Sequence, residues 1–135
     1  MATTPKMLLE LVPVPVTDVD RAKEFYVGKL GFAVDVDIQP SDDVRIVQLT
    51  PPGSACSILL SAGLPEISTM TPGSVKALHL VVADVDGTRA ELVGRGVEMG
   101  EVDLHEGGMK FSHFRDPDGN TLLLQEMPWR AGDFV

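Results

Sequence analysis

The sequence predicts one α+β domain built from two copies of a strand–helix–strand–strand–strand unit. The main observation is a repeat, because Val16-Thr-Asp-Val-Asp20 returns as Val82-Ala-Asp-Val-Asp86, 66 residues later. The turn Pro51-Pro-Gly53 has a counterpart at the same distance, Pro117-Asp-Gly119. Since one spacing holds at a strand end, a helix start and a hairpin turn, we expect an internal duplication whose two copies face each other across a cleft.

The composition is typical of a single globular domain. The 135 residues are 44% hydrophobic and 23% charged, and a chain of this length buries about two-thirds of its surface on folding. A single cysteine, Cys56, and the lack of a signal peptide favour the cytoplasm. No apolar stretch reaches the ~20 residues of a membrane span. The formal net charge of −9 disfavours binding to nucleic acid and to anionic membranes, and would attract cationic ligands.

The first copy begins with an apolar, β-rich segment from Leu8 to Val16. Pro13 and Pro15 remove backbone donors on one side of it, so that this strand can pair fully along one edge only. Thr17 and Asp20 fit a helix-capping pattern, and apolar residues then recur at helical spacing. Three further strands are expected at Ala33–Ile38, Val44–Thr50 and Cys56–Ser61.

The second copy repeats this order. Its helix, Val85–Arg95, is expected to end at Gly96 as the first helix ends at Gly31. Its later strands are expected at Val97–Val102, Met109–Arg115 and Thr121–Glu126. The single domain, residues 1–135, therefore divides into a first module, a linker, a second module and a C-terminal tail, at residues 7–62, 63–74, 75–127 and 128–135.

Two motifs carry a resemblance to a known family. Val16-x-Asp-Val-x-Arg-Ala-x-x-Phe-Tyr26, with Leu30-Gly-Phe32 after it, and Phe114-x-Asp-Pro-Asp-Gly-Asn120 resemble signatures of the vicinal oxygen chelate superfamily. This group includes glyoxalases, extradiol dioxygenases and bleomycin-resistance proteins. The resemblance implies paired βαβββ modules whose mixed sheet curls into a cup, with a helix packed on the outside of each module. It also implies a homodimer, in which the modules pair within one chain or swap between two.

Enzymes of that family hold a divalent metal with His, Gln or Glu from the first and last strand of each module. Such a cation needs three or four nitrogen or oxygen donors. Carried onto this sequence, the ligand positions are Leu11, Ser57 (or Leu59, on the same face), Ala77 and Leu123. None of these is a usual metal ligand, so the resemblance implies a cup without the family metal site and without a cofactor.

Other polar residues near these positions could rebuild a metal site. His79 and Gln125 should face the cup by strand alternation, whereas Glu10 and Glu126 should face outward or towards the helices. His113 lies on the neighbouring strand, and it would form a displaced site with His79 and Gln125 only if all three converge. Otherwise His79 is a cavity histidine bonded to a neighbour.

The expected cup is mostly apolar with a few polar points, which is typical of a pocket for an organic molecule. Trp129, the only tryptophan, could cover the mouth of the cup or a partner, or simply pack on an apolar patch. The expected ligand-binding residues are Leu11, Pro13, Ser57, Leu59, Ala77, His79, Val81, His113, Leu123, Gln125 and Trp129.

Two functions remain open from the sequence. The first is a non-catalytic protein, similar to the bleomycin-resistance branch, that binds a drug or metabolite and so gives antibiotic resistance. The second is a lyase, isomerase or dioxygenase that uses a displaced metal, or acid–base catalysis by His79 without a metal.

Overall fold

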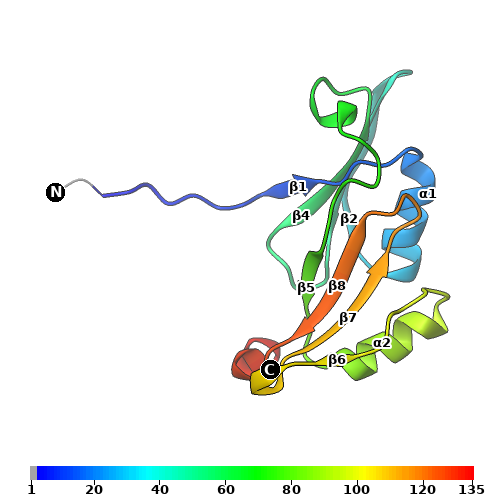
Figure 1. The fold of residues 1–135 in the computed structure, drawn as a ribbon. Helices are drawn as coiled ribbons and strands as arrows, with labels where there is room; N and C mark the ends of the chain where they lie inside the picture. Colours follow the sequence, from blue (N-terminus) through cyan, green and yellow to red (C-terminus); the bar gives the residue numbers. More distant parts are fainter. Residues whose placement is uncertain (1–2) are drawn as a thin grey trace.

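The computed structural model describes residues 3–135 and contains two four-stranded mixed β-sheets, as the sequence predicts (Figure 1). The first sheet has the order β1-β4-β3-β2, with β1 at Leu11–Pro13, β2 at Ala33–Ser41, β3 at Val44–Thr50 and β4 at Ser57–Ala62. The second has the order β5-β8-β7-β6, with β5 at Leu78–Val81, β6 at Asp103–Leu104, β7 at Lys110–Arg115 and β8 at Thr121–Glu126. β1 runs parallel to β4, and β5 runs parallel to β8. The other strand pairs are antiparallel.

The first helix begins one residue later than the capping pattern predicts. α1 (Val19–Lys23) has Asp18 as its N-cap, whose carboxylate accepts a hydrogen bond from the Arg21 amide at 3.1 Å. The hydroxyl of Thr17 instead donates to the Asp118 carboxylate at 2.6 Å. The helix continues as a π-helical segment, η1 (Glu24–Lys29), and the chain then turns at Gly31, where the helix was predicted to end and where φ is positive.

The second helix, α2 (Val85–Gly94), follows its N-cap Asp84 directly. The Glu126 carboxylate also accepts from the amide of the first helical residue, Val85, at 2.8 Å. Glu126 therefore lies on the helix side of the second sheet, as strand alternation predicts.

The strand expected at Val97–Val102 is absent, and the first strand after α2 is the two-residue β6. The Gly100 carbonyl accepts from the side chains of Arg89 and Ser112, at 2.7 and 2.9 Å. Because side chains occupy the Gly100 carbonyl, this carbonyl does not pair with a neighbouring strand, and the segment Val97–Val102 is irregular.

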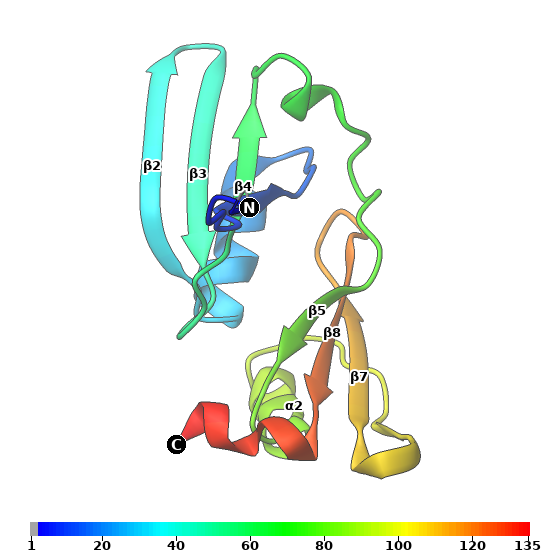
Figure 2. The same ribbon diagram turned by 90° about the vertical axis from the view of Figure 1, so that its left-hand side faces the viewer.

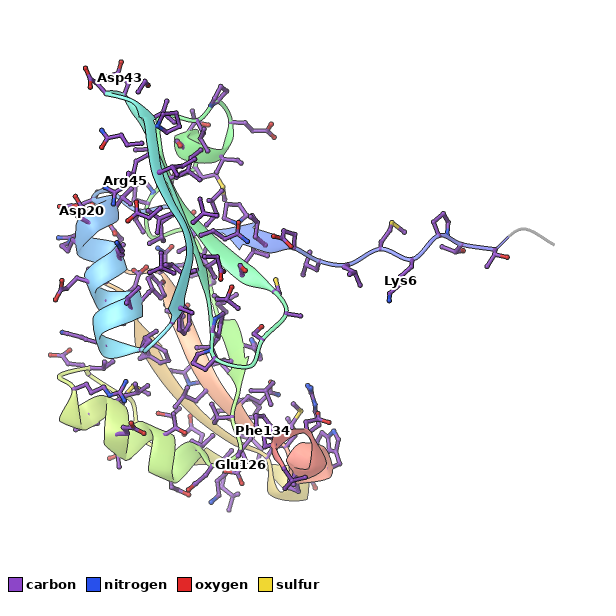
Figure 3. The ribbon with its side chains drawn as sticks, turned by 180° about the vertical axis from the view of Figure 1, so that it is seen from behind. Lys6, Asp20, Asp43, Arg45, Glu126 and Phe134 are labelled. Atoms are coloured by element: carbon purple, nitrogen blue, oxygen red, sulfur yellow. The ribbon has the colours of Figure 1, made fainter. Side chains whose placement is uncertain are left out.

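The strand β1 is also shorter than the apolar segment predicts. The Val14 amide still donates to the Leu59 carbonyl at 2.9 Å, but Pro13 and Pro15 have no amide hydrogen and the pairing ends there. Residues 3–9 extend away from both sheets, as Figures 1 and 3 show, and Figure 3 labels Lys6 on this segment, which we call the arm. Three consecutive apolar side chains of the arm are largely exposed, those of Met7, Leu8 and Leu9.

The two halves of the chain meet at the turn between β7 and β8. The hydroxyl of buried Tyr26 donates to the Asp116 carboxylate at 2.8 Å. The Asn120 side-chain amide donates to the same carboxylate and to the Pro15 carbonyl, each at 2.9 Å. The rings of Phe25 and Phe114 lie 6.5 Å apart in a core that draws on both halves. The motifs that carry the family resemblance therefore join the two halves.

Both helices lie on one side of the two sheets, and Figure 2 views the sheets from the other side. The core between sheets and helices contains Ile58 and Leu60 of β4, and Leu122 and Leu124 of β8. Because side chains alternate along a strand, Ser57 and Leu59, and likewise Leu123 and Gln125, point to the opposite side. We call this side, away from the helices, the open face. None of the helices within residues 3–135 is long and apolar enough to cross a membrane.

Candidate functional site

The centre of the open face in the first sheet lies on β1 and β4. Leu11 pairs with Ser57, and Pro13 pairs with Leu59. Leu11 and Pro13 are half-buried, while Ser57 and Leu59 are buried. This half of the site therefore presents aliphatic carbon and a single hydroxyl at its centre.

The corresponding centre of the second sheet contains more polar groups. His79 pairs with Leu123, and Val81 pairs with Gln125. His113 of β7 also pairs with Leu123, so the two histidines lie in one row on either side of that leucine. Adjacent strands are about 4.8 Å apart, which puts the backbones of the two histidines about 10 Å apart. Both side chains are exposed.

Ala77 does not occupy the position that the 66-residue spacing predicts. It precedes β5, has a φ of 56° and donates its amide hydrogen to the Thr121 hydroxyl at 2.7 Å. The residue that pairs with Leu123, as Leu11 pairs with Ser57, is His79. The 66-residue spacing fails here because the proline-containing segment between β1 and α1 is two residues longer than the segment between β5 and α2. The four central positions of the two sheets are thus Leu11, Ser57, His79 and Leu123.

These four positions do not supply the donor set of the family metal site. They offer one imidazole and one hydroxyl, whereas a catalytic divalent cation takes at least three protein donors. The Nδ1 atom of His79 lies 2.6 Å from the Ala77 carbonyl and is engaged there. Among residues 3–135, no three His, Cys, Asp or Glu side chains are grouped so that they could hold a metal ion. His79 and His113 are separated by the strand that carries Leu123 and Gln125.

Two carboxylates on the first sheet were not expected at the site. Asp35 of β2 accepts a hydrogen bond from the Thr50 hydroxyl, and the Thr50 oxygen lies 2.7 Å from the Ser57 oxygen. Glu10, which strand alternation directs away from the cup, accepts from the Gln48 side-chain amide at 2.9 Å. Strand pairing brings these residues together, and a single sequence does not reveal that register.

A groove of about 630 Å³ borders the edge strand β5. It is lined by His79 and Val81 of the open face and also by residues of the helix-side core, such as Leu92 and Leu124, so it reaches both sides of the sheet at this edge. Trp129 does not line it and is 65% exposed, while Phe134 near the chain end does line it. Other residues along the groove, which the sequence did not indicate, include those of the Pro51–Ser54 turn, Arg130 and Asp133.

Charge is distributed unevenly between the two sides of the first sheet. On the helix side, Arg45 forms ion pairs with Asp37 and Asp20, each at 2.9 Å, and Figure 3 shows Arg45 beside Asp20. On the open face, Asp35 and Glu10 bond only to uncharged side chains in the hydrogen bonds described. The open face of the first sheet is thus rich in hydrogen-bond acceptors.

Comparison with known proteins gives concordant matches. A family model described as "Glyoxalase/Bleomycin resistance protein/Dioxygenase superfamily" matches residues 8–124. The solved antibiotic binding protein TnmS3 from Streptomyces sp. CB03234 is similar, with a TM-score of 0.80 and 35% identity, over 93% of this chain and 99% of that chain. A solved glyoxalase/bleomycin resistance protein from Streptomyces sp. CB03234 gives a TM-score of 0.73 and 38% identity, over 87% and 98%. The uncharacterized protein YetH of Bacillus subtilis (strain 168) is 30% identical over 119 residues, which are 85% of this chain and 94% of YetH.

Proposed function

We propose, from the premise that the chain belongs to the Glyoxalase/Bleomycin resistance protein/Dioxygenase superfamily, that it binds a small organic molecule in an apolar cup without the family metal site. The molecule would be a drug or a metabolite. One observation carries the proposal: the central positions of the two sheets hold Leu11, Ser57, His79 and Leu123. Two of the four are aliphatic, and the other two give too few donors for a divalent cation.

The energy of such binding would come mainly from apolar contact. Burial of apolar surface contributes about 25 cal/mol per Å² removed from water. The half-buried side chains Leu11, Pro13 and Val81 supply that surface. His79 and Gln125 would orient the ligand through hydrogen bonds, which is the usual division of roles in a ligand pocket. The likeness to TnmS3, an antibiotic binding protein with 35% identity, supports a drug as the ligand.

A homodimer is part of this proposal. The helices cover one side of both sheets, so the open face needs another cover (Figure 2). The arm adds three exposed apolar side chains, Met7, Leu8 and Leu9, and monomeric proteins rarely expose large contiguous apolar patches. A second copy related by a two-fold axis would bury the arm and close the cup.

A second candidate function is favoured by the state of His79. Its Nδ1 atom lies 2.6 Å from the Ala77 carbonyl, which can only accept a hydrogen bond, so Nδ1 carries the proton of the neutral ring and Nε2 keeps its lone pair. A lone pair beside a groove could act as a general base on a bound substrate.

Metal analysis and one substitution distinguish these functions. We expect protein purified without chelators to contain far less than one metal ion per chain, before and after exposure to Ni²⁺, Zn²⁺ and Fe²⁺. Stoichiometric metal that disappears in His79→Ala would contradict the proposal. With a ligand in hand, His79→Ala should change affinity modestly. Lost turnover at unchanged affinity would instead support the enzyme.

A further inference from the structure

The acceptor-rich part of the open face contains a chain of three side chains. β2 has a bulge between Val34 and Val36, so that Asp35 has no partner residue on β3. Its carboxylate accepts from the Thr50 hydroxyl, and the Thr50 oxygen lies 2.7 Å from that of Ser57. Bulges often re-aim a side chain beside a functional site. This one directs a carboxylate to the hydroxyls next to the centre of the cup.

The carboxylate fixes the direction of every hydrogen bond in the chain. An ionised carboxylate has no proton to donate, and a hydroxyl has one proton and two lone pairs. Because the Thr50 proton points to Asp35, the Thr50 oxygen can only accept from Ser57. The Ser57 proton is then also engaged, and only lone pairs of its oxygen remain for a ligand. Ser57 thus acts as an acceptor, although an isolated serine can act as donor or acceptor.

A nearby pair of serines shows what the carboxylate adds. The Ser61 hydroxyl lies 2.9 Å from that of Ser68, whose oxygen also accepts from the Leu64 amide. No carboxylate belongs to this pair in the described hydrogen bonds, so either hydroxyl can be the donor. Ser61 is on the same strand and the same face as Ser57, and it is therefore a matched control.

The surroundings of Ser57 agree with an acceptor role. Ser57 is 5% exposed and forms the floor of the open face between Leu11 and Thr50. The Glu10 carboxylate lies on the same face, bonded to Gln48, and the chain has a formal net charge of −9. Negative charge and outward lone pairs together favour a donor, and they repel an acceptor.

We infer that the Asp35–Thr50–Ser57 chain makes the cup selective for apolar molecules that carry a hydroxyl or a protonated amine. This inference rests on the proposed function, because it names a chemical feature of the ligand in the same cup. Ser57 contacts the donor of the ligand, and Thr50 and Asp35 are positioning residues that hold the Ser57 proton away from it.

Two probes that differ in one donor test the inference. 1-Naphthol has a hydroxyl donor, and 1-methoxynaphthalene has an ether oxygen that only accepts. Each is titrated into the full-length protein, and the dissociation constant is obtained from the amide chemical shifts of Leu11, Ser57 and Leu59. We expect 1-naphthol to bind about fivefold more tightly, the effect of one hydrogen bond that the ether cannot make.

Variants then separate the hydrogen-bond direction from the shape of the cup. In Thr50→Val the Ser57 hydroxyl can turn and donate to a ligand, so the ether gains affinity and the ratio falls below about twofold. Ser57→Ala lowers the ratio to a similar value because the acceptor is gone. Ser61→Ala, the matched control, should keep the wild-type ratio. Amide spectra of each variant confirm that it is folded.

The outcomes of this experiment are distinguishable. Equal dissociation constants for the two probes in the wild-type protein would overturn the inference and leave binding in the cup intact. A fivefold ratio that persists in both Thr50→Val and Ser57→Ala would overturn it as well. If neither probe shifts the amides of the open face, the inference is overturned, because the cup then does not take an apolar molecule that carries a hydroxyl, while the proposed function is tested separately by the ligand screen.

Discussion

Tyr26→Phe tests the contact between the two halves of the chain, which helps to fix the position of one sheet relative to the other. The Tyr26 side chain is fully buried, and its hydroxyl donates to the Asp116 carboxylate at 2.8 Å. The substitution leaves the ring in place but removes one of the two side-chain donors of that carboxylate oxygen, the other being Asn120. A hydrogen bond to a charged group contributes about 1.5–3 kcal/mol, so we expect the free energy of unfolding to fall by about 2 kcal/mol.

The same residue predicts a dependence on alkaline pH. Burial, and then the Asp116 carboxylate beside it, raise the pKa of Tyr26 far above its ordinary value of 10.0. Its contribution to stability is therefore complete below pH 10.0, the value of the unfolded chain, and is lost as the pH rises beyond it. The loss is about 1.4 kcal/mol per pH unit in the wild-type protein, and Tyr26→Phe removes this component of the slope.

Urea unfolding at a series of pH values measures both effects. Because the chain has a single tyrosine, tyrosinate absorbance reports the ionisation of Tyr26 alone. Thr71→Val, which removes an exposed hydroxyl that takes part in none of the described side-chain hydrogen bonds, is the control and should change stability by less than about 0.5 kcal/mol. Wild-type stability in Tyr26→Phe, or a tyrosinate signal near pH 10 in protein that is still folded, would refute the role of this hydrogen bond.

Three further predictions follow from other parts of the fold. Gly73→Ala should destabilise the protein by about 2 kcal/mol more than Gly53→Ala. Both glycines have positive φ, but a Cβ at Gly73 would lie 2.4 Å from a backbone oxygen, whereas a Cβ at Gly53 would have no atom within 4 Å. Equal decreases in Tm for the two variants would contradict this. Leu8→Ser with Leu9→Ser should convert a dimer to a monomer in analytical ultracentrifugation, and an unchanged dimer would remove the arm from the interface. Hydrogen bonds from a neighbouring arginine and lysine hold the pKa of Asp37 at about 2, so Asp37→Asn should lower the free energy of unfolding by less than about 1 kcal/mol at neutral pH. The substitution should also abolish the part of the stability that the wild type loses between about pH 4 and pH 2. An identical dependence of stability on acidic pH in both proteins would argue against it.

The sequence predicts the elements whose pattern is local. Val44–Thr50 and Thr121–Glu126 are strands with the predicted bounds, because each is a short β-rich segment bordered by a turn. The helix C-termini at Gly31 and Gly96 are also as predicted, since both glycines have positive φ. Elements that depend on distant partners differ from the prediction. Thr17 bonds to Asp118 and leaves the cap to the next residue.

The candidate site was predictable only in part for the same reason. Strand alternation is local, and it assigns Ser57 and Leu123 to the side away from the helices. The register between strands is not local, so Ala77 was expected where His79 lies. The bulge that brings Asp35 to Thr50 is likewise a property of a strand pair, and a single strand sequence does not show it.

The central claim is that the cup binds an organic molecule without a metal. Its most direct test is a thermal-shift screen of chelator-treated protein against antibiotics and small metabolites, repeated after addition of Zn²⁺, Ni²⁺ or Fe²⁺. A ligand at 100 times its dissociation constant stabilises the folded state by about 2.7 kcal/mol, which corresponds to a rise in Tm of roughly 10 °C for a domain of this size. We expect at least one such rise, and we expect it to be equal with and without metal. A rise that appears only after metal is added, or none in the whole library, would contradict it.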